Sequence, residues 1–528
     1  MGGVVPVPAG SSAELNALLW GSAWAGPITF AFADDLSSPS VRVEGGARPD
    51  AALQNAVRAA FAEVRSFTGL DVREGGAGAD IKVVTASALV VGNARIGLGE
   101  GAYAFYPAAS PEAGDMAYGR ALAGFEPGGF AYRAVLHEVG HALGLKHPSE
   151  PGAYAVLPPG RDGPELSVMS ARSAPGAPLS DGLGTQDGGF ARTFMPADIA
   201  ALQHIYGADF SDPSNTRYAF DPREAVKLMT VWDGGGRDTY DFSRYRDDLD
   251  VSLAPGDFSV TGQEPQLNLA QEIGRGDDPI YAEGAVHNAW LFKGDRRSLI
   301  ENAKGGRGDD EITGNVAHNR LEGGRGEDSL IGAAGRDTLL GGPGDDVLRG
   351  GTANDQLFGA GGADRLHGAG GRDLLVGAGG HDWLDGGRAG DRLNGGGGRD
   401  TLSGGTGHDH ILGGKGADRI SGGLGDDVLG GGAQGDRLLG GGGHDTLVGG
   451  GGGYDVMTGG PGGDTFRFAA PGTVTDFGRG NDVLDLPGGV GAEDAVQVGR
   501  HTHVELAGGG AVRLLWVRVE TLTDDAFV

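Results

Sequence analysis

Residues 341–349 spell GGPGDDVLR, and the same nine-residue register runs from Gly305 to Val448. The eighth position of each nonapeptide is Ile or Leu throughout this stretch. A position that is always apolar predicts an inward-facing residue that builds a thin stacked core, while glycine permits the turns between strands. A flexible glycine-rich linker is the alternative, but a linker needs no fixed apolar position. We therefore expect a stack of short strands.

The sixth position of the nonapeptide is acidic in all but one repeat, where it is Asn319. One additional glycine shifts the register before the last two of these aspartates. Each carboxylate joins backbone carbonyls in offering hard oxygen ligands, which suit calcium rather than zinc. Without calcium, the stacked carboxylates should repel one another and leave the domain largely disordered. The predicted calcium ligands are Asp310, Asp328, Asp337, Asp346, Asp355, Asp364, Asp373, Asp382, Asp391, Asp400, Asp409, Asp418, Asp427, Asp436, Asp445, Asp455 and Asp464.

The composition of the 528-residue chain also restricts its function. Glycine supplies 106 residues, most of them in the second half, which sets a repeat region apart from a preceding globular part. A formal net charge of -29 would repel nucleic acid and anionic membranes, and it favours bound cations. Cysteine is absent, so disulfides, thiolate zinc sites and cysteine nucleophiles are excluded. The sequence contains no run of about eighteen apolar residues, so no membrane span is predicted.

A second informative stretch, HEVGHALGLKH, begins at His137. His141 lies four residues later, so a helix presents both imidazoles on one face to the same ion. Gly144 can take the left-handed conformation that ends a helix, which turns the chain and brings His147 to that ion. Three protein ligands leave the fourth zinc position open for water, and Glu138 is the expected general base. We therefore predict one catalytic zinc ion bound by the three histidines.

The first two hundred residues alternate strand and helix patterns, which suggests a mixed α/β unit. One helix is expected to begin at an Asp50 cap and to bury Leu53, Val57, Phe61 and Val64, which recur at helical spacing. Further helices are expected at about 131–143 and 196–206, and strands at 28–32, 81–84 and 102–106.

The zinc pattern resembles that of the metzincin peptidases, and the surrounding sequence is similar to the serralysin branch, peptidase family M10. The resemblance implies that Met169, in the sequence Ser-Val-Met-Ser, forms an apolar Met-turn beneath the histidines. It also implies that Ala102–Pro107 is a cleft-rim strand, to whose edge a peptide substrate adds. Serralysins usually carry a tyrosine two residues after the Met-turn methionine, and here that position is Ala171.

The nonapeptides resemble the RTX, or hemolysin-type, calcium-binding repeats. This resemblance implies a parallel β-roll with two nonapeptides per turn, in which aspartates eighteen residues apart stack along one side. We accordingly expect an α+β metzincin-type catalytic domain followed by an all-β parallel β-roll (RTX) domain. The expected segments are a leader or short propeptide at 1–20, the zinc metallopeptidase domain at 21–210, a β-rich connecting segment that packs on the repeats at 211–304, the calcium-binding roll at 305–467, and a C-terminal β cap with a secretion signal at 468–528.

The N-terminus shows no ordinary signal peptide. The final four residues, Asp525 to Val528, place an acidic residue before three apolar ones and resemble the C-terminal signal of RTX proteins. The resemblance implies a type I ABC exporter as partner during secretion and an extracellular, bacterial location. We expect a monomer without stable membrane insertion.

Together these patterns predict a secreted, serralysin-like zinc metalloendopeptidase with one catalytic Zn²⁺ and several structural Ca²⁺ ions. Its expected reaction is hydrolysis of peptide bonds in extracellular protein or peptide substrates by zinc-activated water, with Glu138 as the general base. The alternative is a calcium-folded extracellular binding or adhesin-like relative with weak or no hydrolysis. Ala171 keeps this alternative open, because the tyrosine that would stabilise the oxyanion is missing.

Overall fold

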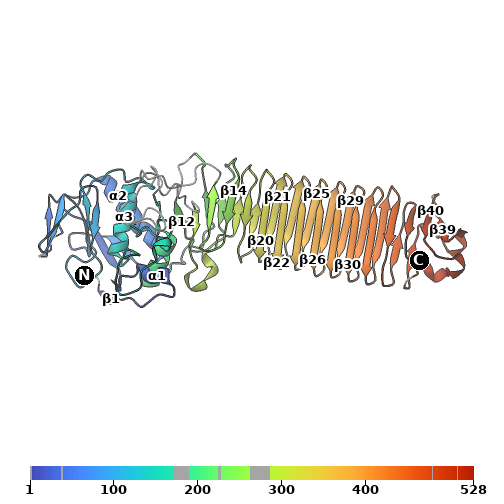
Figure 1. The fold of residues 1–528 in the computed structure, drawn as a ribbon, viewed down its shortest axis with the longest axis horizontal. Coiled ribbons are helices and arrows are strands. Elements are labelled where there is room, and N and C mark those ends of the chain that lie inside the picture. Colours follow the sequence, from blue (N-terminus) through green and yellow to red (C-terminus); the bar gives the residue numbers. More distant parts are fainter. Residues whose placement is uncertain are drawn as a thin grey trace. The chain divides into compact units, whose positions relative to one another are not determined.

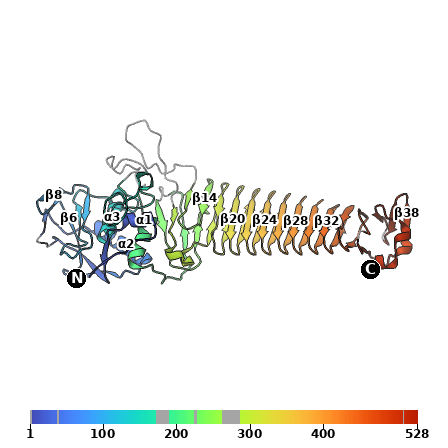
Figure 2. The same cartoon turned by 60° about the horizontal axis from the view of Figure 1, so that its bottom comes forward.

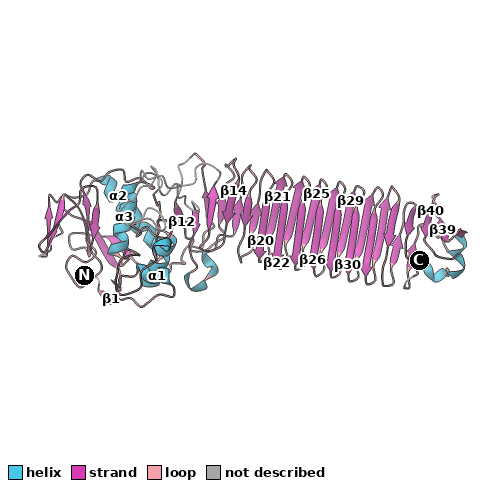
Figure 3. Cartoon of the chain, in the orientation of Figure 1, coloured by secondary structure: helices cyan, strands magenta, loops and turns pink. Residues whose placement is uncertain are grey.

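The structure is a computed structural model that describes residues 3–36, 38, 40–171, 190–223, 228–261, 286–478, 480–507 and 509–528. Two units share the chain, and neither is continuous in sequence. The first contains residues 1–217, 221–238 and 253–300, and the second contains residues 218–220, 239–252 and 301–528. Figure 3 distinguishes the helical elements of the first unit from the long series of strands in the second.

A five-stranded sheet organises the first unit, in the order β5-β3-β6-β10-β9. Its strands are parallel except β9, which lies antiparallel to β10 at one edge of the sheet. The strands are β3 (Ile28–Phe32), β5 (Val72–Glu74), β6 (Ile81–Ala86), β9 (Ala102–Ala104) and β10 (Met116–Gly119). Smaller antiparallel sheets contain β1 (Val4–Pro6) with β2 (Ser22–Trp24), and β4 (Val41–Glu44), β7 (Ala88–Val91) and β8 (Ala94–Gly97).

Three longer helices share a core with this sheet. In α2 (Ala51–Phe67), the Asp50 carboxylate accepts the backbone N–H of Leu53, and the predicted apolar positions are at most 1% exposed. The predicted cap and buried face of this helix are therefore confirmed. The other two helices are α3 (Phe130–Ala142) and α4 (Pro196–Tyr206), within about one residue of the predicted bounds. Figure 1 labels α2 and α3 within the first unit.

The predicted leader segment is structured in this unit. Ser12 caps the short helix α1 (Ala13–Leu18), in which Leu18 is fully buried, and Leu19 directly after it is buried as well. Leu19 forms a β-bridge with Leu145, and the Tyr154 hydroxyl donates to the carbonyl of Val7. The segment thus contributes buried residues, Leu18 and Leu19 among them, to the core of the first unit.

The second unit is a parallel β-roll, as the nonapeptides predict. Strands from alternate repeats pair in two sheets with an offset of eighteen residues, so that Leu348 lies beside Leu330 in one sheet and Leu339 beside Leu357 in the other. The position-eight side chains from Ile312 to Leu447 are at most 3% exposed and form the core between the sheets. Figure 2 labels every second strand of one sheet of this stack, including β20 (Ser329–Ala334), β24 (Arg365–Gly370) and β28 (Thr401–Thr406), and Figure 1 also labels β21 (Thr338–Pro343) of the other sheet.

The ladder begins before the first complete repeat. Strand β13 (Thr239–Asp241) pairs with β17 (Asn302–Lys304), and β14 (Leu249–Ser252) pairs with β18 (Glu311–Thr313). In two of these turns the repeat pattern is broken, since Leu249 and Glu301 stand where later turns carry aspartate. Directly before β13, residues 232–238 (WDGGGRD) resemble an imperfect forerunner of the repeats, and Asp238 takes the sixth position. The long stretch between β14 and β17 further interrupts the period.

The C-terminal segment covers the other end of the roll. Strand β36 (Gly472–Val474) pairs with β40 (Ala511–Leu514), which also pairs with β39 (His501–Glu505). Phe527 forms a parallel bridge with Leu484 of β37 (Val483–Asp485), and the backbone N–H of Val528 donates to the Leu484 carbonyl. Among the described residues, no helix is both long and apolar enough to cross a membrane.

Candidate metal centres

Three histidine side chains converge where α3 ends. His137 and His141 lie one turn apart on the helix, and the chain then turns at Gly144, whose φ is 103°. Nε2 of His147 consequently lies 3.0 Å from Nε2 of His137 and 3.2 Å from Nε2 of His141. An added Cβ at Gly144 would lie 2.7 Å from the carbonyl oxygen of Ser22, so both its conformation and its space favour glycine.

The outer nitrogen of each imidazole faces an acceptor. Nδ1 of His137 lies 2.9 Å from the Val168 carbonyl, and Nδ1 of His141 lies 2.8 Å from the Leu145 carbonyl. These contacts favour the tautomer that carries its proton on Nδ1, which leaves Nε2 free to bind a metal. Burial lowers the pKa of all three histidines, that of His141 to about 3, so they remain neutral at physiological pH. Neutral imidazole is the form that binds a metal.

Glu138 lies beside the first histidine with one carboxylate oxygen unused. The residue is 6% exposed, and its Oε2 is buried without a hydrogen-bond partner in the described part of the chain. In the absence of a cation, burial raises the pKa of Glu138 to about 8, although the charge of Arg133 opposes this shift. Three neutral imidazoles beside a carboxylate with an unused oxygen fit a catalytic zinc site with a bound water.

Two buried charged residues, Arg133 and Asp198, hold residues 167–170 below the histidines, and the sequence analysis did not predict this role. We call this pair the clamp. Met169 is fully buried there, with its sulfur against the face of α3 that Gly140 leaves open. Arg133 donates to the carbonyls of Val168 (2.8 Å) and Ser170 (2.5 Å). Asp198 accepts hydrogen bonds from the Ser167 hydroxyl and from the backbone N–H of Val168 at 2.5 and 2.7 Å. Ala171 ends this segment, and Arg172 lies outside the described residues.

The predicted calcium ligands form two columns in the roll. Oδ1 of each aspartate accepts the backbone N–H of the sixth-position residue one turn earlier, as from Asp373 to Asp391 at 2.8 Å. The second oxygen, Oδ2, is buried without a hydrogen-bond partner at most of these positions in the described chain. These positions are Asp328, Asp337, Asp346, Asp355, Asp364, Asp373, Asp382, Asp391, Asp400, Asp409, Asp418, Asp427, Asp436, Asp445 and Asp464.

These unpaired oxygens fit a bound cation. Without one, burial and the neighbouring carboxylates raise the pKa of both Asp346 and Asp391 to about 7. A stack of buried carboxylates is costly unless protons or cations neutralise it. The donor set contains only oxygen, which suits calcium. The residues present therefore fit the ion that the nonapeptide pattern predicts.

Near both ends of the roll, the side-chain oxygens of sixth-position residues accept hydrogen bonds from the chain itself and so have no need of a cation. Gly306 donates its backbone N–H to Oδ2 of Asp310 at 2.6 Å, and Gly478 donates to Oδ2 of Asp482 at the same distance. The amide of Asn319 is likewise occupied, since its oxygen accepts the N–H of Asn315 at 2.7 Å. Asp482 continues one column beyond the last predicted ligand, because its Oδ1 accepts the N–H of Asp464.

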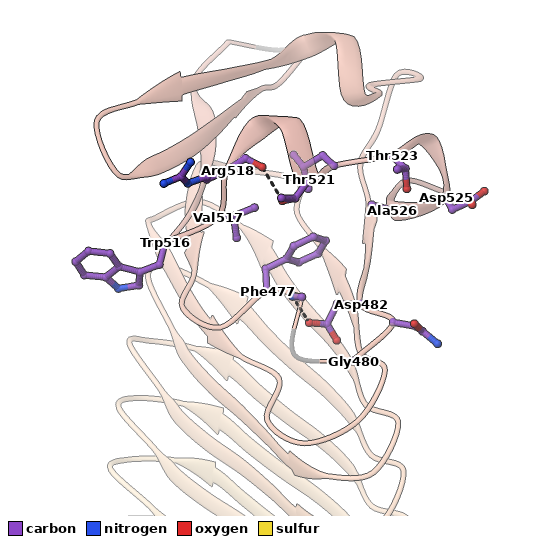
Figure 4. A pocket seen from close by; sticks show the side chains of 13 residues that line it. Phe477, Gly480, Asp482, Trp516, Val517, Arg518, Thr521, Thr523, Asp525 and Ala526 are labelled. Atoms are coloured by element: carbon purple, nitrogen blue, oxygen red, sulfur yellow. Dashed lines mark hydrogen bonds between the residues drawn. The ribbon is translucent and has the colours of Figure 1, made fainter.

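Asp482 also lines a pocket of about 860 Å³ at the end of the second unit, shown in Figure 4. Its wall includes two residues of the predicted export signal, Asp525 and Ala526. Figure 4 shows Phe477 beside Asp482. Trp516 lies at the outside of the pocket, where the residue is 65% exposed. The pocket contains no cluster of side chains that suggests a catalytic function.

The fold and the sites together define a class: a unit in which two histidines of a helix and a third just beyond it converge, combined with a parallel roll of carboxylate-lined nonapeptides. Residues 197–289 match the family described as peptidase M10 serralysin C terminal, and overlapping matches to the RTX calcium-binding nonapeptide repeat span residues 304–466. These matches and the relatives below identify the chain as a relative of the serralysin-type metalloproteases with RTX repeats, as predicted.

Two curated relatives show the extent of this similarity. The chain is 32% identical over 213 residues to "Serralysin G" of Dickeya chrysanthemi, an alignment that covers 37% of this chain and 38% of that protein. It is 31% identical over 211 residues to "Metallopeptidase AprA" of Pseudomonas marginalis, covering 37% of this chain and 39% of the relative. The matched region thus spans less than two fifths of these relatives' length.

One solved structure is also similar, the extracellular lipase LipA from Serratia marcescens. It is 18% identical to this chain and has a TM-score of 0.15, with 40% of this chain and 44% of the lipase covered.

Proposed function

We propose that this protein is a secreted zinc-dependent endopeptidase. The observation that carries the proposal is the convergence of three neutral imidazoles, with Nε2 of His147 3.0 Å from that of His137 and 3.2 Å from that of His141, beside the unpaired buried oxygen of Glu138. His137, His141 and His147 would hold the zinc ion. Bound zinc would lower the pKa of its water to roughly 7 and polarise the scissile carbonyl.

The residues of the chain have separate roles in this proposal. Oε2 of Glu138 accepts a proton from the attacking water and later donates it to the leaving amine nitrogen. A carboxyl whose pKa is raised to about 8 by burial, before a cation is bound, holds a proton readily enough for this transfer. The carbonyls of Val168 and Leu145 keep two imidazoles oriented, and the clamp by Arg133 and Asp198 fixes the Met-turn carbonyl that one of them uses.

The edge strand β9 supports a peptide as the substrate. It lies at the end of the five-stranded sheet, paired on one side only with β10. An extended peptide can therefore add to its free edge through backbone hydrogen bonds, which favours broad tolerance of substrate sequence. Burial raises the pKa of Tyr103 in this strand and of Tyr106 just after it, and the nearby Glu138 adds to both shifts.

The roll supports the extracellular part of the proposal. Calcium would bind between the turns at the unpaired carboxylate oxygens, so the domain would fold where calcium is abundant. A chain that stays unfolded in a low-calcium cell suits export by a type I exporter, with Asp525 to Val528 as the proposed signal. The segment boundaries expected from the sequence remain part of this proposal.

Hydrolysis of casein by the purified full chain, with zinc and calcium present, tests the proposed activity. Glu138→Gln should reduce kcat by at least about 100-fold, since general acid–base catalysis contributes 10²–10⁴-fold, while bound zinc stays near one per chain. Glu63→Gln is the matched control: burial also raises the pKa of Glu63 to about 8, but its carboxylate accepts the N–H of Phe194, away from the histidines. Equal activity of Glu138→Gln and wild type would refute the assignment of the base.

The second candidate is a calcium-folded binding or adhesin-like protein with little hydrolysis. Ala171 favours it, because no phenol is available at that position to stabilise the oxyanion. Zinc-loaded wild-type protein that leaves casein and mixed peptides intact would favour this alternative over the peptidase.

A further inference from the structure

The third histidine is held differently from the other two. His137 and His141 lie on a helix and face backbone carbonyls, whereas His147 lies beyond the end of the helix. Its Nδ1 faces the Glu150 carboxylate, with 3.4 Å between Nδ1 and Oε2. This distance is within ion-pair reach but longer than a normal hydrogen bond. The position of this ring therefore depends on what holds Glu150.

Glu150 is itself held by residues remote in sequence. The Tyr106 hydroxyl donates to the same Oε2 atom at 2.9 Å. The Tyr106 ring stacks on Trp20, with centroids 3.8 Å apart and planes 6° from parallel, and it meets His141 edge-on at 5.0 Å. Tyr106 therefore contacts both the carboxylate and a second zinc-site histidine.

The N-terminal segment also supports the turn that leads to His147. The backbone N–H of Trp20 donates to the Gly144 carbonyl at 3.0 Å, and Lys146 donates its N–H to the Leu18 carbonyl at 2.8 Å. The Lys146 side chain then closes the following loop, because its Nζ donates to the Glu150 carbonyl at 2.6 Å. Residues 18–20 thus contact the chain on the N-terminal side of His147, while Glu150 lies on the C-terminal side.

From these contacts we infer that Glu150 is a positioning residue for the third zinc ligand, held in place by Tyr106 and Trp20. The inference rests on the proposed zinc site. A carboxylate beside Nδ1 favours the tautomer with Nε2 free, restricts the orientation of the ring and increases the donor strength of Nε2. His147 needs this support most, because no helix restricts its side chain.

The measurement is the zinc dissociation constant of the calcium-loaded full chain, obtained by competition with a chromogenic chelator. Glu150→Ala should bind zinc about 10–100-fold more weakly, the usual effect of removing such an outer partner. Glu150→Gln should lie between this variant and wild type, because its amide oxygen still faces Nδ1 but carries no charge. Tyr106→Phe keeps the stacking on Trp20 but loses the hydroxyl, and should weaken binding by a smaller factor than Glu150→Ala.

Glu112→Ala is the matched control. Its carboxylate also accepts hydroxyl hydrogen bonds, from Ser38 and Ser40 at 2.9 and 3.0 Å, and it contacts none of the three histidines. It should bind zinc as wild type does. The melting temperature of the zinc-free, calcium-loaded protein should be the same for all variants, so a change confined to zinc affinity separates positioning from general destabilisation.

The outcomes separate this inference from the proposed function. Wild-type protein that binds no zinc would refute the proposed function. Wild-type protein that binds zinc, together with Glu150→Ala binding within twofold of it, would overturn the role of Glu150. If Glu150→Ala does not fold, Tyr106→Phe decides, and unchanged affinity in that variant overturns the inference.

Discussion

The metal-free roll should become more stable as the pH falls, which would remove much of its need for calcium. In the folded chain without calcium, burial and neighbouring carboxylates raise the pKa of several sixth-position aspartates, that of Asp346 and Asp391 to about 7. In the unfolded chain the same groups titrate near the ordinary aspartate pKa of 3.8. Between these values the folded roll binds protons that the unfolded chain releases, so its stability falls as the pH rises.

The sign and size of the effect of pH on the stability of the calcium-free roll follow from these pKa shifts. A raised carboxyl pKa contributes stability that is fully present below about pH 4 and is lost as the pH passes through about 7. For Asp391, a rise from 3.8 to about 7 corresponds to about 4 kcal/mol, at about 1.4 kcal/mol per pKa unit. The residue is 1% exposed, so solvent reduces this value little, although coupling between neighbours makes the contributions non-additive. A few such groups are comparable to the whole stability of a domain.

Calcium titrations at several pH values test this reasoning, with the β signal of the full chain in circular dichroism as the readout. At pH 8 the roll should be disordered without calcium and fold on its addition. At about pH 5 much of the β signal should be present before calcium is added, and the ion should bind more weakly because it must displace protons. Asp391→Asn imitates the protonated side chain and should stabilise the metal-free roll at pH 8. A metal-free β signal that is flat or decreases between pH 8 and 5 would refute the argument.

Two further predictions concern single positions of the roll. Gly398 has a φ of 146° and an added Cβ would overlap the carbonyl oxygen of Gly380, so Gly398→Ala should cost at least about 3 kcal/mol in calcium-loaded urea unfolding. Gly397→Ala, one residue earlier with its nearest contact at 3.8 Å, should change stability by less than about 1 kcal/mol, and equal losses in both variants would contradict the packing. Asp482→Asn should leave the number of bound calcium ions unchanged, because Gly478 already occupies its Oδ2. Equilibrium dialysis should show that Asp391→Asn binds fewer ions, and equal loss in the two variants would disprove the distinction.

The sequence predicted the parts of each site that are local or periodic. The spacing of His137 and His141 on a helix, followed by Gly144, was enough to predict that His147 returns to the same point. In the roll, a fixed apolar eighth position determines the core, and the eighteen-residue offset follows from two nonapeptides per turn. Such features could be predicted because each depends on residues close together in sequence or repeated at a constant interval.

The parts that were missed depend on contacts between distant residues. Tyr106 reaches Glu150 across 44 positions, and Arg133 reaches Ser170 across 37, with no motif connecting either pair. Trp20 was assigned to an expected leader because residues 1–20 as a whole were interpreted as small and polar, although Leu18 and Leu19 beside it are buried. The repeat that contains Asp310 likewise resembles the other repeats in sequence. It differs in the structure because the backbone N–H of Gly306 donates to Oδ2 of Asp310, the oxygen that is unpaired in most other repeats.

The two candidate metal centres differ in whether their buried polar groups have partners before an ion binds. This difference predicts how each centre depends on its ion. In the histidine site, carbonyls of Val168 and Leu145 satisfy the outer nitrogens, and burial keeps the imidazoles neutral, so the site can persist before a metal arrives. In the roll, most internal aspartates leave one buried oxygen unpaired, which makes the folded state depend on protons or calcium. Zinc should therefore bind to an existing site and add chemistry, whereas calcium should contribute directly to the free energy of folding.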